Sequence, residues 1–442
     1  MSAHAVHTPT RDELVRLIAN KPVSPRLRLV SLLLAAIGAI VFIAGAVTGN
    51  DRAWLALHFN WLFFTICSAA GVTFAAVQRL TTARWSRSVV RFTEGFVAWL
   101  PVAFVLLLLI LFPGAPHIFT WAKQTVEVHQ KAIYLDPTFF RLRGLLLFGT
   151  MTAVMGWFVY RSVRLDVGLI PEDGAGWAAG IRAGMRRGFG DERRELHSTH
   201  SILGKLAVLV VMLYGYGWVV LSWDYSMTLS LHFQSTMYGW QIFMGAWLGM
   251  LMALTVIMRY WRAHLGGTDL INDNHYHDVG KLCFAFTAFW GYLTFGQYLV
   301  IWYGNLPEET HYFRLRLIDP WGWLTTAVFT MMFVVPFFTL LSKAAKLYSP
   351  VMATVAFTTI LGLWFHRYLE VYPSVLGEVA GLPFGLYEIA IGLGMLGLWG
   401  FCYLSFMDAF PKMRVAFITS PYRDEVQVPV DARTMEPLPA HE

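Results

Sequence analysis

Residues 27–48, LRLVSLLLAAIGAIVFIAGAVT, decide the fold class, because Arg28 is the one charged residue among them. A helix of about 20 mostly apolar residues is long enough to cross the hydrocarbon core of a bilayer. Further stretches of this kind lie at 53–77, 89–112, 139–160, 202–223, 237–258, 279–303, 321–342, 350–371 and 384–407. The sequence therefore predicts an all-α polytopic membrane protein with ten transmembrane helices.

The composition of the whole chain favours the same class. Of 442 residues, 56% are hydrophobic and 14% are charged, whereas about 25% are charged in an average soluble protein. This excludes an ordinary cytosolic enzyme, a disordered protein and a disulfide-stapled secreted domain. The three cysteines, Cys67, Cys283 and Cys402, lie in apolar stretches. They are too few to hold an iron–sulfur cluster or a four-cysteine zinc site.

Lysine and arginine residues predict the orientation. When alternate loops are assigned to opposite sides, 26 of the 34 basic residues fall on the side of the N-terminus. Cytoplasmic loops carry an excess of basic residues. Both termini are therefore expected in the cytoplasm, and the basic charge indicates topology rather than a nucleic-acid partner.

Three regions follow from this division. Residues 1–26 form a polar cytoplasmic segment, in which Thr10-Arg-Asp-Glu13 resembles a capping box and predicts a short amphipathic helix. Residues 27–410 form the membrane domain. Residues 411–442 contain several prolines and are expected to be an extended cytoplasmic tail.

Polar residues near the predicted outer face suggest a binding site. The candidates are His58, Asp224, Tyr238 and Gln297, which come from different helices but share one depth. A quinone head group needs a His or Tyr donor, a carboxylate that takes the released proton, and aromatic walls. The alternative is an interfacial belt of aromatic residues with polar groups that face solvent.

Other ionisable residues could form a proton path, because such groups are costly inside a membrane. The candidates are Glu94, His275, His277, Asp278, His366 and Glu370. For the pair in the ninth helix the alternative is a structural ion pair between a glutamate and neighbouring Arg367. The histidines lie mostly at helix ends, so they cannot form the central pairs that a b-type haem requires. No metal site is predicted.

Two stretches resemble a known family. They are SWDYSMTLSLHFQSTMYGWQIFMGAW at 222–247 and KLCFAFTAFWGYLTFGQYLVIWYGNLPEE at 281–309. Both are similar to the NrfD/PsrC-like quinol-interacting membrane subunits, and within that family to the ActF group of bacterial alternative complex III. The related ActC group usually carries a Glu where this chain has Gln297.

The resemblance implies two four-helix bundles, helices 2–5 (about 53–223) and helices 6–9 (about 237–371), with helices 1 and 10 alongside. It implies a subunit of the bacterial cytoplasmic membrane that binds no cofactor itself, with menaquinol or ubiquinol as the substrate of the complex. The implied partners are a sister NrfD-like subunit, an iron–sulfur subunit, c-type cytochromes with c-haem, lipids and a terminal oxidase. In ActC-like members the quinol site lies in the outer half of the first bundle, where His58 and Asp224 are expected.

Two alternatives remain open. Pro101 in the third helix and Pro336 in the eighth are compatible with a stand-alone secondary transporter, since transporters often contain interrupted helices in both halves. The third interpretation is a structural scaffold that docks redox subunits and lipids.

Overall fold

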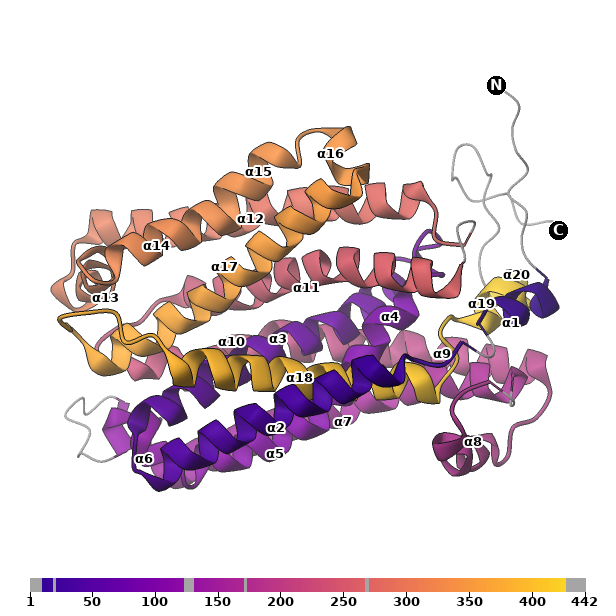
Figure 1. Ribbon diagram of the computed structural model, residues 1–442, viewed down its shortest axis with the longest axis horizontal. Helices are drawn as coiled ribbons and strands as arrows, with labels where there is room; N and C mark the ends of the chain where they lie inside the picture. Colours follow the sequence, from indigo (N-terminus) through magenta and orange to yellow (C-terminus); the bar gives the residue numbers. More distant parts are fainter. Residues whose placement is uncertain (1–9, 19–20, 123–130, 171–172, 267–269, 427–442) are drawn as a thin grey trace.

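The computed structural model describes residues 10–18, 21–122, 131–170, 173–266 and 270–426, and within them it contains helices and no β-strand. Ten helical stretches are long and apolar enough to cross a membrane, which confirms the prediction of a multi-pass helical protein. They run roughly parallel to the long axis of the molecule (Figure 1). Their bounds are Pro25–Val47, Asp51–Leu80, Val90–Leu111, Pro137–Leu169, Glu192–Leu229, Thr236–Leu265, Asp273–Gly304, Gly322–Thr339, Ser349–Leu376 and Leu386–Ala409.

Seven of these stretches are single helices, namely α2 (Pro25–Val47), α3 (Asp51–Leu80), α7 (Pro137–Leu169), α11 (Thr236–Leu265), α12 (Asp273–Gly304), α17 (Ser349–Leu376) and α18 (Leu386–Ala409). The others are interrupted. A 3₁₀ turn at Gly95–Trp99 separates α4 (Val90–Glu94) from α5 (Leu100–Leu111), and a π turn at Leu213–Gly217 separates α9 (Glu192–Met212) from α10 (Trp218–Tyr225). A second π turn, at Thr330–Val334, lies between α14 (Gly322–Phe329) and α15 (Val335–Thr339).

The interruptions have local causes. Pro101 and Pro336 each follow a non-α turn, and a proline cannot donate the backbone hydrogen bond that a continuous helix requires. The π turn Leu213–Gly217 contains two glycines. Single π turns within helices often occur beside functional sites.

The helix α3 is the centre of the packing. It contacts α5, α9, α11, α17 and α18. In its most apolar window 89% of the residues are buried. Contacts also join α5 to α7, α7 to α9, α11 to α12 and α17, and α14 to α17. A central helix with protein on all sides explains why α3 is apolar around its whole circumference.

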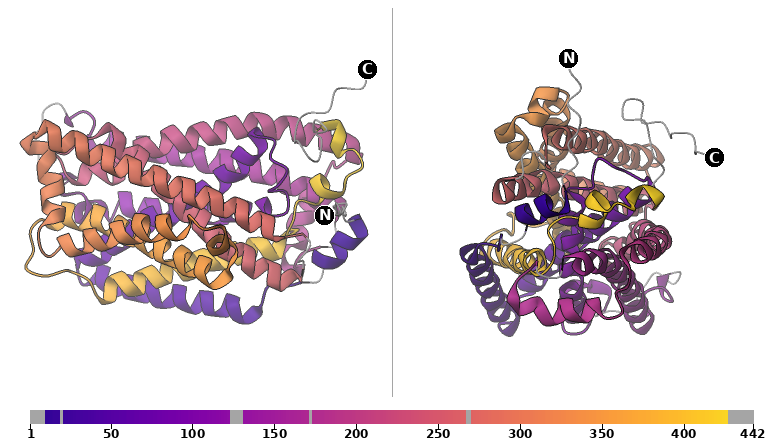
Figure 2. Two further views of the ribbon diagram at one scale, coloured as in Figure 1. Left: turned by 90° about the horizontal axis from the view of Figure 1, so that it is seen from above. Right: turned by 90° about the vertical axis from the view of Figure 1, so that its right-hand side faces the viewer.

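Short helices mark the two ends of the molecule. Figures 1 and 2 show α1 (Arg11–Ile18), α8 (Ala179–Arg186), α19 (Val415–Thr419) and α20 (Arg423–Val426) at one end, which we call the α1 end. The opposite end, called the α13 end, carries α6 (Ala115–Ile118) and α13 (Pro307–Leu317). A further short helix, α16 (Lys343–Leu347), directly precedes α17 in the chain. The first and last described segments therefore lie at the same end.

The two terminal segments differ in how well the sequence anticipated them. The capping box at α1 is present, because the Thr10 amide donates to Glu13 Oε2 at 2.8 Å and the Glu13 amide donates to Thr10 Oγ1 at 3.3 Å. The sequence predicts that the C-terminal tail is extended. Its described part, residues 411–426, instead packs against the long helices, and Val415 and Phe417 are buried there. The apolar side chains of α19 explain this packing, since they cover the ends of those helices.

The helices α2 and α18 approach each other closely at small residues. A Cβ atom built on Gly394 would lie 2.5 Å from the Cα atom of Gly38, and one on Gly397 would lie 2.5 Å from the carbonyl oxygen of Ser31. Small residues of this kind let membrane helices pack through their backbones.

Replacing Gly394 with alanine should force α2 and α18 apart, because the new methyl group would meet backbone rather than a movable side chain. Overpacking of this kind costs about 1–3 kcal/mol, so thermal unfolding in detergent should occur at a lower temperature. G156A is the matched control, since a Cβ atom at Gly156 of α7 has open space around it. Equal melting temperatures for the two variants would contradict the tight contact.

Candidate functional site

A cavity at the α13 end brings together four of the residues that the sequence singled out. Tyr238, Gln297, His366 and Glu370 all line it, although they come from α11, α12 and α17. The cavity has a volume of about 120 Å³, which is room for several waters or part of a ring system. Its other walls include Gln241, Trp290, Thr294, Tyr312, Phe313, Arg316 and Phe329. We call it the α17 cavity.

Glu370 is the carboxylate of the α17 cavity. Its Oε2 atom accepts from Arg367 Nη1 at 2.6 Å and from the Ser226 hydroxyl at 3.4 Å. Its Oε1 atom lies 3.0 Å from His366 Nδ1, which is ion-pair distance when the imidazole is protonated, and neither atom makes a hydrogen bond in the described part of the chain. Arg367 therefore pairs with Glu370, and the second carboxylate oxygen faces the His366 imidazole nitrogen beside it.

Two buried donors face the same cavity without an acceptor. Gln297 Nε2 and Trp290 Nε1 have no hydrogen-bond partner among the described residues. An unpaired buried donor is costly, so such groups usually mark a bound water or ligand. Neighbouring Gln241 is satisfied, because its Nε2 atom donates to Thr294 Oγ1 at 2.9 Å. The cavity thus offers free donors on α12 opposite a carboxylate on α17.

The helix α13 closes the cavity with an arginine and a tyrosine. Arg316 donates to the carbonyl oxygens of Leu369 at 3.0 Å and Tyr312 at 2.8 Å, and its guanidinium carbon lies 3.4 Å from the centre of the Tyr312 ring. Burial raises the pKa of the Tyr312 phenol, which keeps its proton. Gln297 also lines a wider surface hollow of about 580 Å³ with Trp223.

His58 and Asp224 lie at the same end but do not line the α17 cavity. Asp224 is fully buried and accepts two hydrogen bonds from Arg143, at 2.9 and 2.7 Å, and one from the Tyr134 hydroxyl at 2.7 Å. Burial and the Asp224 charge raise the pKa of Tyr134, so that Tyr134 remains a donor. Asp224 is therefore the counter-ion of a closed network.

His58 lies among aromatic rings, close to the network that encloses Asp224. Its Nε2 atom lies 2.6 Å from the Tyr225 carbonyl oxygen, so Nε2 carries the proton and donates, while Nδ1 has no partner. Rings of Trp61 and Phe119 pack beside it. Ser226 directly follows Tyr225, and its hydroxyl lies 2.6 Å from the Tyr238 hydroxyl. The segment 224–226 consequently links the His58 region to the α17 cavity.

The remaining members of the expected proton path lie toward the α1 end. Glu94 is fully buried between Arg91 and Arg414, and Arg91 also pairs with Asp166. Asp166 in turn accepts from the Ala416 amide at 2.8 Å. Two carboxylates and two guanidinium groups therefore form a neutral cluster that anchors α19 to α4 and α7.

The residues at the start of α12 have local roles. The His275 ring nitrogen Nδ1 lies within hydrogen-bonding distance of Asn272, in a capping box at 2.8 Å. Asp278 pairs with Lys281 at 2.7 Å, and His277 is only partly buried beside them. His366 and Glu370 lie near the other end of the molecule. The structure thus divides the candidate proton-path residues between the two ends of the helices.

Several residues of the site could not be recognised from sequence. Trp290, Arg316 and Ser226 become important only because α12, α13 and the α10–α11 connection converge on Glu370. Their one sequence signal was a polar or aromatic side chain in or beside a span, which many residues share. No known protein-family model matches this chain, and no curated protein matches it. Within the described residues, no three His, Cys, Asp or Glu side chains group closely enough to hold a metal ion.

Replacing Glu94 with glutamine should destabilise the protein strongly, because Arg91 and Arg414 would lose a buried counter-ion. Breaking a buried pair costs about 3–5 kcal/mol, and the loss should appear as a lower melting temperature in detergent. E425Q is the matched control, since Glu425 is an exposed residue that pairs with Arg193 at the same end. A melting temperature for E94Q as high as that of E425Q would show that the cluster is not structural.

Proposed function

We propose that this chain is an NrfD/PsrC-like membrane subunit of a bacterial quinol:electron-acceptor oxidoreductase, closest to the ActF group of alternative complex III. The α17 cavity is the observation that carries the proposal, because it joins a carboxylate, an imidazole, amide and indole donors and aromatic walls in one space. The resemblance of residues 222–309 supports the same function, since these residues supply Ser226, Tyr238 and Gln297.

The helix contacts also support the family fold. Successive contacts join α3, α5, α7 and α9, and a second set joins α11, α12, α14, α15 and α17. This pattern agrees with two four-helix bundles flanked by α2 and α18. Because α1 and α19 lie at the same end, it also agrees with two termini on the cytoplasmic side. In this orientation the α17 cavity faces the outer half of the membrane.

The residues of the α17 cavity are suited to managing protons. A quinol releases two protons and two electrons when it becomes a quinone. Gln297 Nε2 and Trp290 Nε1 would hold the ring oxygens. Glu370 Oε1 would accept the first hydroxyl proton and pass it to His366 Nδ1, 3.0 Å away, so that Glu370 could accept the second. The electrons would pass to the iron–sulfur and c-haem groups of partner subunits, which include a sister NrfD-like chain. This division assigns proton handling to the present chain.

The region around His58 and Asp224 is a weaker candidate for the quinol site. Every polar atom of the Asp224 carboxylate is engaged by Arg143 or Tyr134, so an incoming proton would have to break a closed network. We therefore assign Asp224 to structure and place the proton acceptor at Glu370. His58 Nδ1 remains a polar atom without a partner beside aromatic rings.

Replacing Glu370 with glutamine should lower quinol oxidation by the purified complex by about a hundredfold, which is the size of effect expected for a lost proton acceptor. The complex should still assemble, because glutamine keeps the shape and can accept from Arg367. E308Q is the matched control, since Glu308 is an exposed glutamate at the same end. Turnover of E370Q equal to that of E308Q would remove Glu370 from the mechanism.

Purification under mild conditions separates this function from secondary transport. The interruptions at Gly95–Trp99 and Thr330–Val334 are single 3₁₀ and π turns within continuous helical paths, not unwound segments. We expect the chain to co-purify with haem-containing and iron–sulfur proteins, visible as c-haem absorbance in the same fraction. A lone monomer that moves a solute across vesicles would contradict the proposal.

A further inference from the structure

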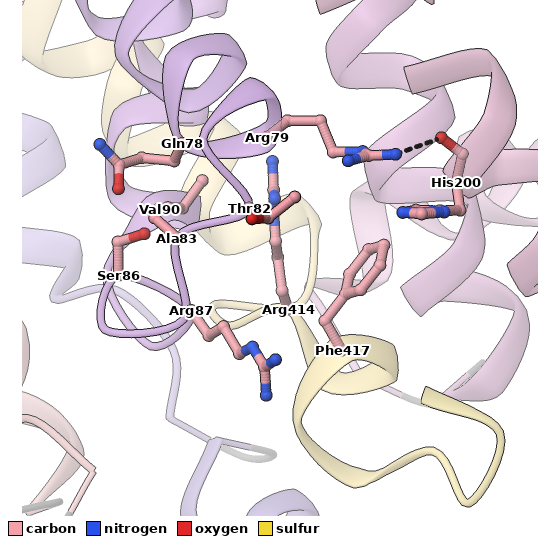
Figure 3. A pocket seen from close by; sticks show the side chains of 10 residues that line it. All are labelled: Gln78, Arg79, Thr82, Ala83, Ser86, Arg87, Val90, His200, Arg414 and Phe417. Atoms are coloured by element: carbon pink, nitrogen blue, oxygen red, sulfur yellow. Dashed lines mark hydrogen bonds between the residues drawn. The ribbon is translucent and has the colours of Figure 1, made fainter. Parts of the chain in front are cut away.

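A basic pocket lies at the α1 end, far from the α17 cavity. It is formed by the last turn of α3, the turn that follows it, the first part of α9 and the segment that leads into α19 (Figure 3). The residues used below are Arg79, Thr82, Ser86, Arg87, His200 and Arg414. We call this the Arg79 pocket. Nothing in the proposed redox function makes use of it.

The Arg79 pocket is positively charged. Arg79, Arg87 and Arg414 line it, and its lining includes no aspartate or glutamate. Arg414 is balanced by Glu94, which lies in the buried cluster rather than in the pocket. Arg79 donates to the His200 carbonyl oxygen at 2.9 Å and makes no ion pair within the described chain. The pocket thus holds the positive charge of Arg79, for which its walls supply no carboxylate.

Unused hydrogen-bond donors lie in the same place. Ser86 is 1% exposed, and its hydroxyl has no hydrogen-bond partner in the described chain. Arg79 Nε is also buried without an acceptor. In Figure 3 the Ser86 hydroxyl points toward the side of the pocket along which Arg414 runs. Buried donors without acceptors indicate that an acceptor is supplied from outside the chain.

The walls of the pocket are held in place. Arg414 is fixed by its pair with Glu94, and Phe417 packs beside it on α19. The turn that follows α3 contains Thr82, whose backbone is in the left-handed region with φ of 50°. The carbonyl oxygens of Val77 and Gln78 accept from the amides of Thr81 and Ala83. These oxygens at the end of α3 therefore do not enter the pocket as competing acceptors.

We propose that the Arg79 pocket binds a phosphate-class anion. Guanidinium groups and a hydroxyl form a donor set that matches phosphate oxygens in charge and geometry. On the orientation indicated by the basic residues, the pocket lies on the cytoplasmic side, where headgroups of anionic phospholipids reach the ends of transmembrane helices. A lipid phosphodiester and a free phosphate share this chemistry, so the experiment has to separate them.

The test uses the full-length protein in an uncharged detergent with three probes: phosphatidylglycerol, phosphatidylcholine and inorganic phosphate. Native mass spectrometry counts bound lipid, and the melting temperature reports stabilisation by each probe at constant ionic strength. Preferential binding of phosphatidylglycerol identifies a lipid phosphate, because phosphatidylcholine carries a compensating cation. Stabilisation by inorganic phosphate alone identifies a soluble anion.

Substitutions in the pocket decide whether this binding belongs to it. R79Q should weaken binding of the effective probe about tenfold or more, since a charge-assisted hydrogen bond is lost, and S86A should weaken it less. R193Q is the matched control, because it removes one positive charge from an exposed residue on α9 at the same end. S86A keeps the test valid even where R79Q fails to fold, since the Ser86 hydroxyl makes no hydrogen bond to any residue that the structure describes.

The outcomes are distinct. Binding that falls in R79Q and S86A but not in R193Q supports the proposal and names the source of the phosphate. The proposal is overturned if binding is the same in all variants. It is also overturned if neither phosphatidylglycerol nor inorganic phosphate binds better than phosphatidylcholine. Neither result depends on quinol turnover.

Discussion

The structure depends on one electrostatic constraint, that a charge buried away from water needs an opposite charge or hydrogen-bonding partners. Removing a carboxylate from water costs several kcal/mol unless a cation and hydrogen bonds compensate for it. Among the described residues, six of the seven buried carboxylates pair with an arginine. The pairs are Arg28–Asp408, Arg52–Glu388, Arg91–Glu94, Arg91–Asp166, Arg143–Asp224 and Arg367–Glu370. Most of these join segments that are far apart in the sequence, so the charges also fix which helices are neighbours.

The pairs differ in how completely they are closed. Glu388 accepts from Arg52 twice, from the Tyr372 hydroxyl at 2.6 Å and from the Gly385 amide at 2.7 Å, which ties α18 to α3 and α17. Asp224 is enclosed in the same way by Arg143. Glu370 instead presents one oxygen to a cavity and to the His366 imidazole. A closed pair can only stabilise the fold, whereas an open one can exchange a proton.

The two ends of the molecule consequently carry different chemistry. At the α13 end, aromatic rings and a few polar atoms surround the α17 cavity, which suits an apolar ring with polar oxygens. At the α1 end, arginines neutralise the buried carboxylate of Glu94 and also line the Arg79 pocket. The C-terminal segment belongs to this second region, because Arg414 and the Ala416 amide complete the cluster. Residues after the last long helix are thus part of the membrane fold.

The sequence alone determined the class of fold, because ten apolar stretches of bilayer length have few alternatives to crossing a membrane. It also identified Tyr238, Gln297, His366 and Glu370 as unusual, since polar residues are rare in such stretches. Only the tertiary structure decided which of them meet. Helix phase and packing place those four around one cavity, enclose Asp224 with Arg143 and bury Glu94 between two arginines. The physical reason is that hydropathy depends on each residue by itself, whereas the pairing of charges depends on distances between helices that the local pattern does not contain.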